Sequence, residues 1–215
     1  MTIIFDLDGT LIDSSERMYR LFQKLVPQSQ FSKEQYWELK RDKINHKMIL
    51  ERYFEEIDFY RFNEKWLKQI ELEKYLKMDE PFYDTEDVLK ALRANSISLI
   101  LLTARQSKER LLEELERMDI LKYFNLVLTT EGIKSKELLL RDSISEGKIK
   151  RSNNDLFISD MGKDILLGRE YGYYTIAITH GFMNAKRLLE YEPNKIIDNL
   201  SDILYFISKD DTREI

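Results

Sequence analysis

The stretch TIIFDLDGTLID, at residues 2–13, places two aspartates one residue apart at the end of an apolar run. Thr2 to Phe5 are typical of a short, fully buried strand. The run stops at Asp6, and Gly9 follows Asp8 at once, so the chain can swing away sharply after the strand. Two carboxylates at the tip of such a strand are either turn formers or part of a reactive site. The remaining sequence bears on that choice.

Composition differs between two parts of the 215-residue chain. Residues 14–83 hold 14 of the 25 aromatic residues and both tryptophans, but none of the seven glycines. The flanking segments hold every glycine and most of the β-branched runs. We therefore predict an all-helical insert, or cap, at residues 14–83, placed within an α/β core formed by residues 1–13 and 84–215.

Three helical stretches are expected in the insert. The first is capped by Asp13 or Ser14 and ends before Pro27, and the second begins near Lys33. The apolar faces are Met18, Leu21, Phe22 and Leu25 in the first stretch, Leu50, Tyr53, Phe54 and Ile57 in the second, and Phe62, Trp66 and Ile70 in the third. The segment MDEPFYD, interrupted by Pro81, is the expected return linker.

Helices and strands alternate after this linker. The expected helices cover residues 84–94, 107–118, 135–145 and 163–171. The strands ISLILLT, FNLVLTT, DLFISD and YYTIAIT follow them in turn, and NKIID is a candidate for a last short strand. This alternation predicts an α/β fold, a Rossmann-like parallel sheet with helices on both faces.

The overall composition excludes several classes of protein. Without cysteine, the chain can form neither a disulfide framework nor a thiolate metal site. Its net charge of −5 argues against a general nucleic-acid binder. No apolar run approaches membrane-spanning length, and the first residues form no basic leader segment. We expect a cytoplasmic protein without nucleic-acid or membrane partners, either monomeric or weakly homodimeric.

Four polar clusters fall at the ends of predicted strands or in the loops beyond them. They are DLDGT at 6–10, TAR at 103–105, IKSK at 133–136 and SDMGKD at 159–164. Reactive groups of open parallel sheets gather at the carboxyl ends of the strands. Each cluster alone is a weak signal, because aspartates often form turns or cap helices and lysines at helix starts are often only solvated. Their shared placement favours a common site.

These clusters resemble the four motifs of the haloacid dehalogenase superfamily, whose members are mostly Mg2+-dependent phosphatases. FDLDGT, LLTAR, a following lysine and ISDMGKD carry the resemblance, which covers residues 1–13 and 84–206. The insert matches the position and size of that family's helical cap, and the whole looks like cap-bearing phosphatases of the phosphoglycolate phosphatase or beta-phosphoglucomutase type. Ser159 stands where the family commonly has glycine.

A phosphate ester and several carboxylates repel one another, so a site built from aspartates needs a divalent cation. Hard oxygen ligands suit Mg2+, which prefers few carboxylates and keeps water in its shell. We expect Asp6 and Asp160 to bind the metal through their side chains and Asp8 through its backbone carbonyl. Asp164, one helical turn after Asp160, is expected to support the water shell of the metal.

The resemblance also implies catalytic and phosphate-binding roles. Asp6 would attack phosphorus to form an aspartyl-phosphate, and Asp8 would protonate the leaving oxygen and then activate water. The phosphoryl oxygens would be bound by the Thr103 hydroxyl, the Ala104 backbone N–H and a lysine. Lys136 matches the family spacing slightly better than Lys134, and the choice between these two lysines stays open.

These assignments predict a Mg2+-dependent phosphatase acting on a small phosphomonoester through an aspartyl-phosphate. A phosphomutase using the same Asp6 and Asp8 is one alternative, and a non-catalytic phosphate-binding or phosphoacceptor module is another. Dehalogenation is disfavoured, because it needs neither a metal nor an acid at position 8. The basic cluster KRDKINHK at 40–47 is either a solvated helix face or a lip for an anionic substrate.

Overall fold

The computed structural model describes residues 1–210, with side chains described through residue 207. Its centre is a six-stranded, fully parallel sheet in the order β5–β4–β1–β6–β7–β8. The strands are β1 (Thr2–Phe5), β4 (Ser98–Thr103), β5 (Leu126–Thr129), β6 (Leu156–Ser159), β7 (Tyr174–Ile178) and β8 (Lys195–Ile197). The Rossmann-like parallel sheet predicted from the alternating pattern is confirmed.

Helices cover both faces of the sheet because its central strands are apolar on both sides. Ile3 and Phe5 of β1 pack with α6, α7 and α11, whereas Ile4 between them packs with α8 and α9 on the opposite face. The helices of the core are α6 (Thr85–Ala94), α7 (Lys108–Arg117), η1 (Leu121–Tyr123), α8 (Lys136–Ser145), α9 (Gly162–Glu170), α10 (Ala185–Leu189) and α11 (Asp202–Asp210). Across residues 1–210, none of the helices combines the length and the apolar character that crossing a membrane requires.

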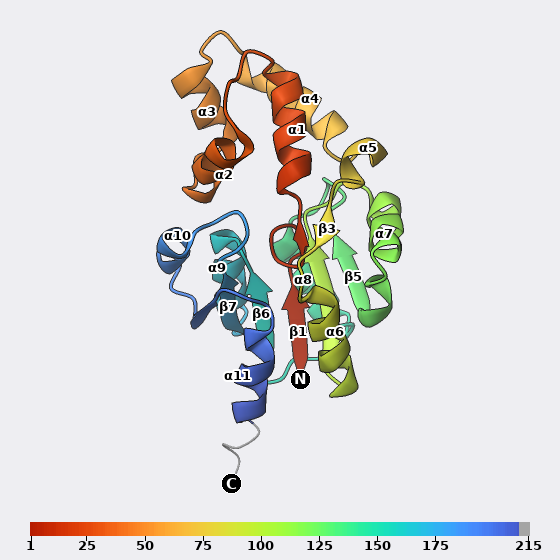
Figure 1. The fold of residues 1–215 in the computed structure, drawn as a ribbon. Helices are drawn as coiled ribbons and strands as arrows, with labels where there is room; N and C mark the ends of the chain where they lie inside the picture. The colour runs from red at the N-terminus through yellow and green to blue at the C-terminus, as the bar shows by residue number, and fades with distance from the viewer. Residues whose placement is uncertain (211–215) are drawn as a thin grey trace.

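Residues 15–76, which lie between β1 and α6 along the chain, form a separate helical bundle. Its helices are α1 (Ser15–Leu25), α2 (Lys33–Arg41), α3 (His46–Tyr53), α4 (Phe59–Gln69) and α5 (Glu73–Leu76). They enclose an apolar cluster of their own, which includes Phe22, Tyr36 and Trp66. Figure 1 shows this bundle at the top of the view, beyond the tip of the β1 arrow.

The chain leaves and re-enters the core at one place. Two short segments, β2 (Ile12–Asp13) and β3 (Glu80–Pro81), pair there as antiparallel strands. Asp13 also starts α1, because its carboxylate accepts a hydrogen bond from the Ser15 backbone N–H at 2.8 Å, while Ser14 at the N-cap position makes no side-chain capping bond. The division of the chain after residues 13 and 83 stays a prediction, and this strand pair lies close to both boundaries.

The second helical stretch of the insert differs from the prediction. It is broken into α2 and α3 at residues 42–45, where Lys43 has a left-handed φ of 66° and the Asn45 side chain caps α3. Asp and Asn side chains compete with helical backbone bonds, which explains a break that apolar spacing does not reveal. Tyr53, expected on the buried face, is 46% exposed, whereas Leu50 is buried.

Candidate active site

The candidate site forms where β1, β4 and β6 end. The sheet register aligns Phe5 with Leu101 on one side and with Ile158 on the other. Parallel strands present their carboxyl ends at the same edge, so the segments that follow Phe5, Thr103 and Ser159 meet there. Three of the four sequence motifs therefore come together at one edge of the sheet, and α8 carries the lysine of the fourth to it.

Lys136, at the start of α8, links two of the carboxylates. Its Nζ lies 2.7 Å from Asp6 Oδ1 and 2.6 Å from Asp164 Oδ2, and Ser159 Oγ donates to the same Asp164 oxygen at 3.0 Å. Burial raises the pKa of Asp6 to about 6, although Lys136 acts in the opposite direction. Burial also lowers the pKa of Lys136, but the two carboxylates outweigh this and raise it, so the lysine stays charged.

The two lysines left open by the sequence lie in different places. Lys134 is on the surface and pairs with Asp142 at 3.0 Å. Only Lys136 of the two reaches the carboxylates at the strand ends. The serine at position 159 has a use that a glycine would lack, because its hydroxyl helps to hold Asp164.

Asp160 is held tightly between two loops. Its Oδ1 accepts a hydrogen bond from Thr10 Oγ1 at 3.1 Å, and its Oδ2 accepts one from the Phe182 backbone N–H at 2.6 Å. Burial raises the pKa of Asp160 well above its usual range, and the charge of Asp6 raises it further. Gly9 has a φ of 80°, and a Cβ at this position would lie 2.2 Å from Asp160 Oδ2. Both the left-handed φ and the close approach to Asp160 therefore require glycine in the turn after β1.

Thr103 closes β4 with a hydroxyl that has no partner within the described part of the chain, although the residue is fully buried. An unsatisfied buried hydroxyl costs on the order of 1–3 kcal/mol, so an oxygen atom from a bound ligand would stabilise it. Ala104, the next residue, is exposed. This edge of the site thus offers an unused donor where the sequence predicts phosphate binding.

Asp8 has surroundings that the sequence did not indicate. Arg105 donates two hydrogen bonds to it, from Nε to Oδ2 at 2.7 Å and from Nη2 to Oδ1 at 3.0 Å. Arg17 donates a third, from Nη2 to Oδ1. Burial by itself would raise the pKa of Asp8, but the two guanidinium groups lower it to about 2. Asp8 is therefore ionised in this structure.

The two arginines belong to a buried ion cluster that consists of Asp8, Arg17, Asp79, Arg105 and Glu114. Arg17 Nε lies 3.0 Å from Asp79 Oδ2, and Arg105 Nη2 lies 3.1 Å from both Asp79 Oδ2 and Glu114 Oε2. Three carboxylates face two guanidinium groups. Burial raises the pKa of Asp79 to about 8, and the charges of Asp8 and Glu114 add to the rise. The raised pKa of Asp79 favours a protonated carboxyl group within the cluster near neutral pH.

Sequence reasoning missed this cluster for a physical reason. The bonds from Arg17 to Asp8 and Asp79 and from Arg105 to Asp8 join residues 9, 62 and 97 positions apart. No helical or strand period connects such separations. Arg105 stands in the TAR motif, yet nothing in the motif indicates its partner. The THGF segment after β7 was also missed, although it follows a predicted strand end and supplies the Phe182 N–H to Asp160.

A Mg2+ ion at this site would be bound by two carboxylate side chains, not by three. No three His, Asp or Glu side chains converge on one ion position within the described part of the chain. Mg2+ is commonly bound by one or two carboxylates and several waters. Asp6 and Asp160, whose charges interact, would hold it together with the backbone carbonyl of Asp8. Asp164 pairs with Lys136 and would act on the water shell only.

The basic cluster at 40–47 is not a single surface. Arg41 donates to the backbone carbonyls of Thr179 and His180, at 2.8 and 3.5 Å, and so joins α2 to the loop after β7. Lys43 pairs with Glu190 of the core at 2.7 Å. These two residues belong to the rim along which the insert meets the core.

The other three basic residues of this cluster differ from one another in their surroundings. Lys47 is exposed and pairs with Glu51 within α3. His46 lies against Tyr36, with its Nε2 2.8 Å from the phenol oxygen, and burial lowers its pKa well below the usual range. Lys40 makes no ion pair among the described residues, and burial lowers its pKa to about 8.

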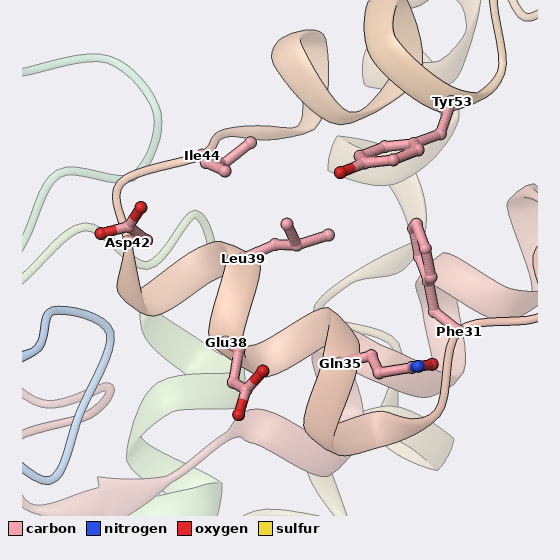
Figure 2. Close-up of a pocket in the computed structure, with 7 residues that line it drawn as sticks. All are labelled: Phe31, Gln35, Glu38, Leu39, Asp42, Ile44 and Tyr53. Atoms are coloured by element: carbon pink, nitrogen blue, oxygen red, sulfur yellow. The ribbon is translucent and has the colours of Figure 1, made fainter.

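A pocket of about 370 Å3 lies on the insert, away from the strand ends. It is lined by Phe31, Gln35, Glu38, Leu39, Asp42, Ile44 and Tyr53. Figure 2 shows that Leu39, Ile44 and Tyr53 face one another across the space between α2 and α3. None of the residues predicted to act in catalysis or metal binding lines this pocket, so it is not the candidate active site.

Comparison with known proteins points to one family. A family model described as haloacid dehalogenase-like hydrolase matches residues 3–178. The chain is 26% identical over 216 residues to a putative pyrophosphatase PpaX of Clostridium perfringens, covering 96% of this chain and 97% of that protein. It is 23% identical to phosphoglycolate phosphatase 1 of Pseudomonas aeruginosa, over 94% of this chain and 78% of the relative. A haloacid dehalogenase-like family protein from Streptococcus pneumoniae has the same fold, with a TM-score of 0.77, 20% identity and coverage of 96% and 97%.

Proposed function

Because the chain belongs to the haloacid dehalogenase-like hydrolases, we propose that it is a phosphatase that hydrolyses a small phosphomonoester with Mg2+ and through a phosphoryl group carried on Asp6. The observation that carries this proposal is the convergence of three groups at one sheet edge: the Asp6 carboxylate, the Lys136 ammonium and the unpaired Thr103 hydroxyl. The phosphatase and pyrophosphatase names of the relatives support phosphate chemistry.

In the first step, an Asp6 oxygen attacks phosphorus and the bond to the leaving oxygen breaks. The charge of the transferring phosphoryl group spreads over its three equatorial oxygens. Lys136 is already within 2.7 Å of Asp6, so its charge is in place to stabilise them. The Thr103 hydroxyl and the Ala104 N–H are the further donors. Mg2+ would supply Lewis-acid stabilisation when held by Asp6, Asp160 and the Asp8 carbonyl.

Asp8 transfers the proton both in the attack on the ester and in the hydrolysis of the aspartyl-phosphate. In the first step it gives the leaving oxygen a proton that it has taken up from solvent, and in the second step it takes one from the water that hydrolyses the aspartyl-phosphate. Arg17 and Arg105 hold Asp8 in the ionised form, which is the form that the second step needs. The first step needs a proton on Asp8, so we expect the enzyme to prefer leaving groups that require little protonation.

The insert acts as a lid in this proposal. It joins the core through the adjacent segments β2 and β3, and it lies beyond the carboxyl ends of the strands (Figure 1). Closing would exclude bulk water from the phosphoryl group and strengthen the charge interactions around it. Arg41 and Lys43 contact the core along the rim and would separate from it when the lid opens.

The experiment that tests this function is turnover of a chromogenic phosphate ester and of a panel of metabolite phosphates, with and without Mg2+. We expect Mg2+-dependent release of free phosphate from wild type and none from Asp6→Asn. Conversion of a sugar phosphate to its isomer in place of release would identify a phosphomutase. Stable binding of phosphate without turnover would identify a non-catalytic module and contradict the proposal.

A further inference from the structure

We propose that Arg17, carried by the first helix of the insert, positions the Asp8 carboxylate, so that the insert itself completes the acid–base group of the active site. This inference rests on the proposed function, in which Asp8 moves the proton. Arg17 is thereby a positioning residue and not a catalytic one, because it acts through Asp8.

Arg17 contacts three parts of the chain at once. Its Nη2 donates to Asp8 in the loop after β1, its Nε donates to Asp79 next to β3, and its Nη1 donates to the Ile70 carbonyl of the insert at 3.3 Å. The residue is only 3% exposed. A single buried guanidinium thus joins the reactive loop, the return connection and the insert.

The Asp8 carboxylate is oriented by the full set of donors around it. Arg105 bonds both oxygens from one side, and Arg17 adds its donor to Oδ1. Arg105 belongs to the core and follows the end of β4, whereas Arg17 lies in the first turn of α1. Rotation of the insert about β2 and β3 would move the Arg17 donor and leave the Arg105 donors in place. The orientation of Asp8 therefore depends on the position of the insert relative to the core.

Arg117 offers a matched control, because it contacts the same connection between the insert and the core. Arg117 of α7 donates to the backbone carbonyls of Leu76 and Asp79, at 3.0 and 3.1 Å. Like Arg17, it ties the return connection to another part of the molecule. Unlike Arg17, it does not contact Asp8. Replacing Arg117 therefore weakens the return connection without removing a hydrogen-bond donor from the Asp8 carboxylate.

The first measurement is thermal unfolding in a double-mutant cycle, and it is independent of activity. Arg17→Gln removes one of the two cations facing three carboxylates, so it should lower Tm more in wild type than in an Asp8→Asn background, where one carboxylate is already neutral. Equal Tm losses in both backgrounds would show that the two side chains do not interact and would overturn the inference.

The second measurement is steady-state kinetics with Mg2+ and a phosphate ester that wild type turns over. We expect Arg17→Gln to lower kcat by about 10- to 100-fold with KM nearly unchanged, since misplacing a reactive group by about 1 Å can cost about 100-fold. Arg17→Lys, which can still donate to Asp8, should recover part of kcat. Arg117→Gln should leave kcat within about twofold of wild type even if its Tm falls.

The outcomes separate the two proposals. If wild type turns over no phosphate ester, the proposed function fails, and the positioning role fails with it. If wild type is active and Arg17→Gln retains full kcat, only the positioning role is wrong. If Arg17→Gln and Arg117→Gln lose kcat equally and in proportion to their Tm, Arg17 is a structural tie and the inference is overturned.

Discussion

Asp6 and Asp8 stand two residues apart, yet different parts of the molecule hold them. Asp6 is paired with Lys136, which belongs to the core, and its pKa is raised by burial to about 6. Asp8 is paired with Arg105 of the core and Arg17 of the insert, and these lower its pKa to about 2. Two carboxylates of one short motif therefore have different electrostatic surroundings, because their neighbours come from different parts of the molecule.

A movement of the insert would change the contacts of Asp8 but not those of Asp6. The side chains that bond Asp6 come from the same folded unit as Asp6 itself, so they stay together when the insert moves. One of the donors to Asp8 is on the other side of the connection formed by β2 and β3. We therefore expect Asp6, the proposed nucleophile, to be insensitive to the insert and Asp8, the proposed acid–base group, to depend on it.

The largest effect is expected at Asp6, the proposed nucleophile. Asp6→Asn keeps the shape of the side chain but removes the attacking charge, so phosphatase activity should fall by several orders of magnitude, as it does when other covalent nucleophiles are removed. Phosphate release measures this directly. Asp142→Asn, at a surface carboxylate that pairs with Lys134, is the control and should retain full activity. More than a few per cent of activity in Asp6→Asn would contradict the covalent mechanism.

Next in size is the effect of Asp160, the proposed metal-binding carboxylate. Chelation should abolish activity and Mg2+ should restore it, and Asp160→Ala should raise the Mg2+ concentration needed for half-maximal activity by about 10- to 100-fold. A Mg2+ titration of the rate measures this shift. Asp119→Ala, at an exposed aspartate paired with Lys122, serves as the control. Full activity in the presence of chelator would refute the metal assignment for Asp6 and Asp160 alike.

A smaller effect is expected on the pH dependence of stability through the ion cluster. The pKa of Asp79 is about 8 in the folded protein, above its unfolded value, so the native state holds more protons than the unfolded state between about pH 4 and pH 8. Its contribution to stability is thus present at low pH and is lost as the pH rises through 8. For one proton the slope reaches at most about 1.4 kcal/mol per pH unit.

Urea unfolding at pH 6 and pH 8 tests this prediction. Asp79→Asn cannot ionise, so its free energy of unfolding should fall less between the two pH values than that of wild type. Asp87→Asn, at an exposed position of α6, should keep the wild-type difference. The same difference in Asp79→Asn as in wild type would show that Asp79 does not carry the raised pKa and would contradict the prediction.

The smallest effect is expected in the basic cluster of the insert, which bonds neither aspartate. Lys40 is buried enough to have a lowered pKa and has no ion pair among the described residues, so an anionic substrate is a suitable partner for it. Lys40→Ala should raise KM for larger phosphate esters several-fold and leave acetyl phosphate hydrolysis unchanged. Lys47→Ala, at an exposed residue paired with Glu51, is the matched control. Identical KM values for Lys40→Ala and wild type across a phosphate panel would show that Lys40 does not contact the substrate.

The sheet could be predicted closely from the sequence, because a strand buried on both faces must be a continuous apolar run. Thr2–Phe5 was predicted with the bounds that the structure has, and the later strands differ by one or two residues at each end. The order of strands brings the predicted aspartates, threonine and lysine to one edge, since strand ends in a parallel sheet share an edge. Their chemical roles stay proposals.

The helices of the insert were predicted less well. A period of apolar residues locates a buried face, but a turn of a few residues hardly disturbs it, so the break between α2 and α3 was not seen. The short elements β2, β3, α5 and α10 are below the length at which a period can be recognised. These elements nevertheless decide where the insert meets the core.

The sequence by itself determined the α/β class, the helical insert and the set of residues at the strand ends, because apolar periodicity and strand-end chemistry are local properties. Only the tertiary structure decided which charges face those residues. Arg17, Asp79 and Glu114 reach Asp8 and Arg105 across large separations along the chain, and burial makes each of these charges depend on all the others. The two aspartates of DLD are separated by one residue in the sequence, but the pKa of each follows from neighbours that only folding supplies.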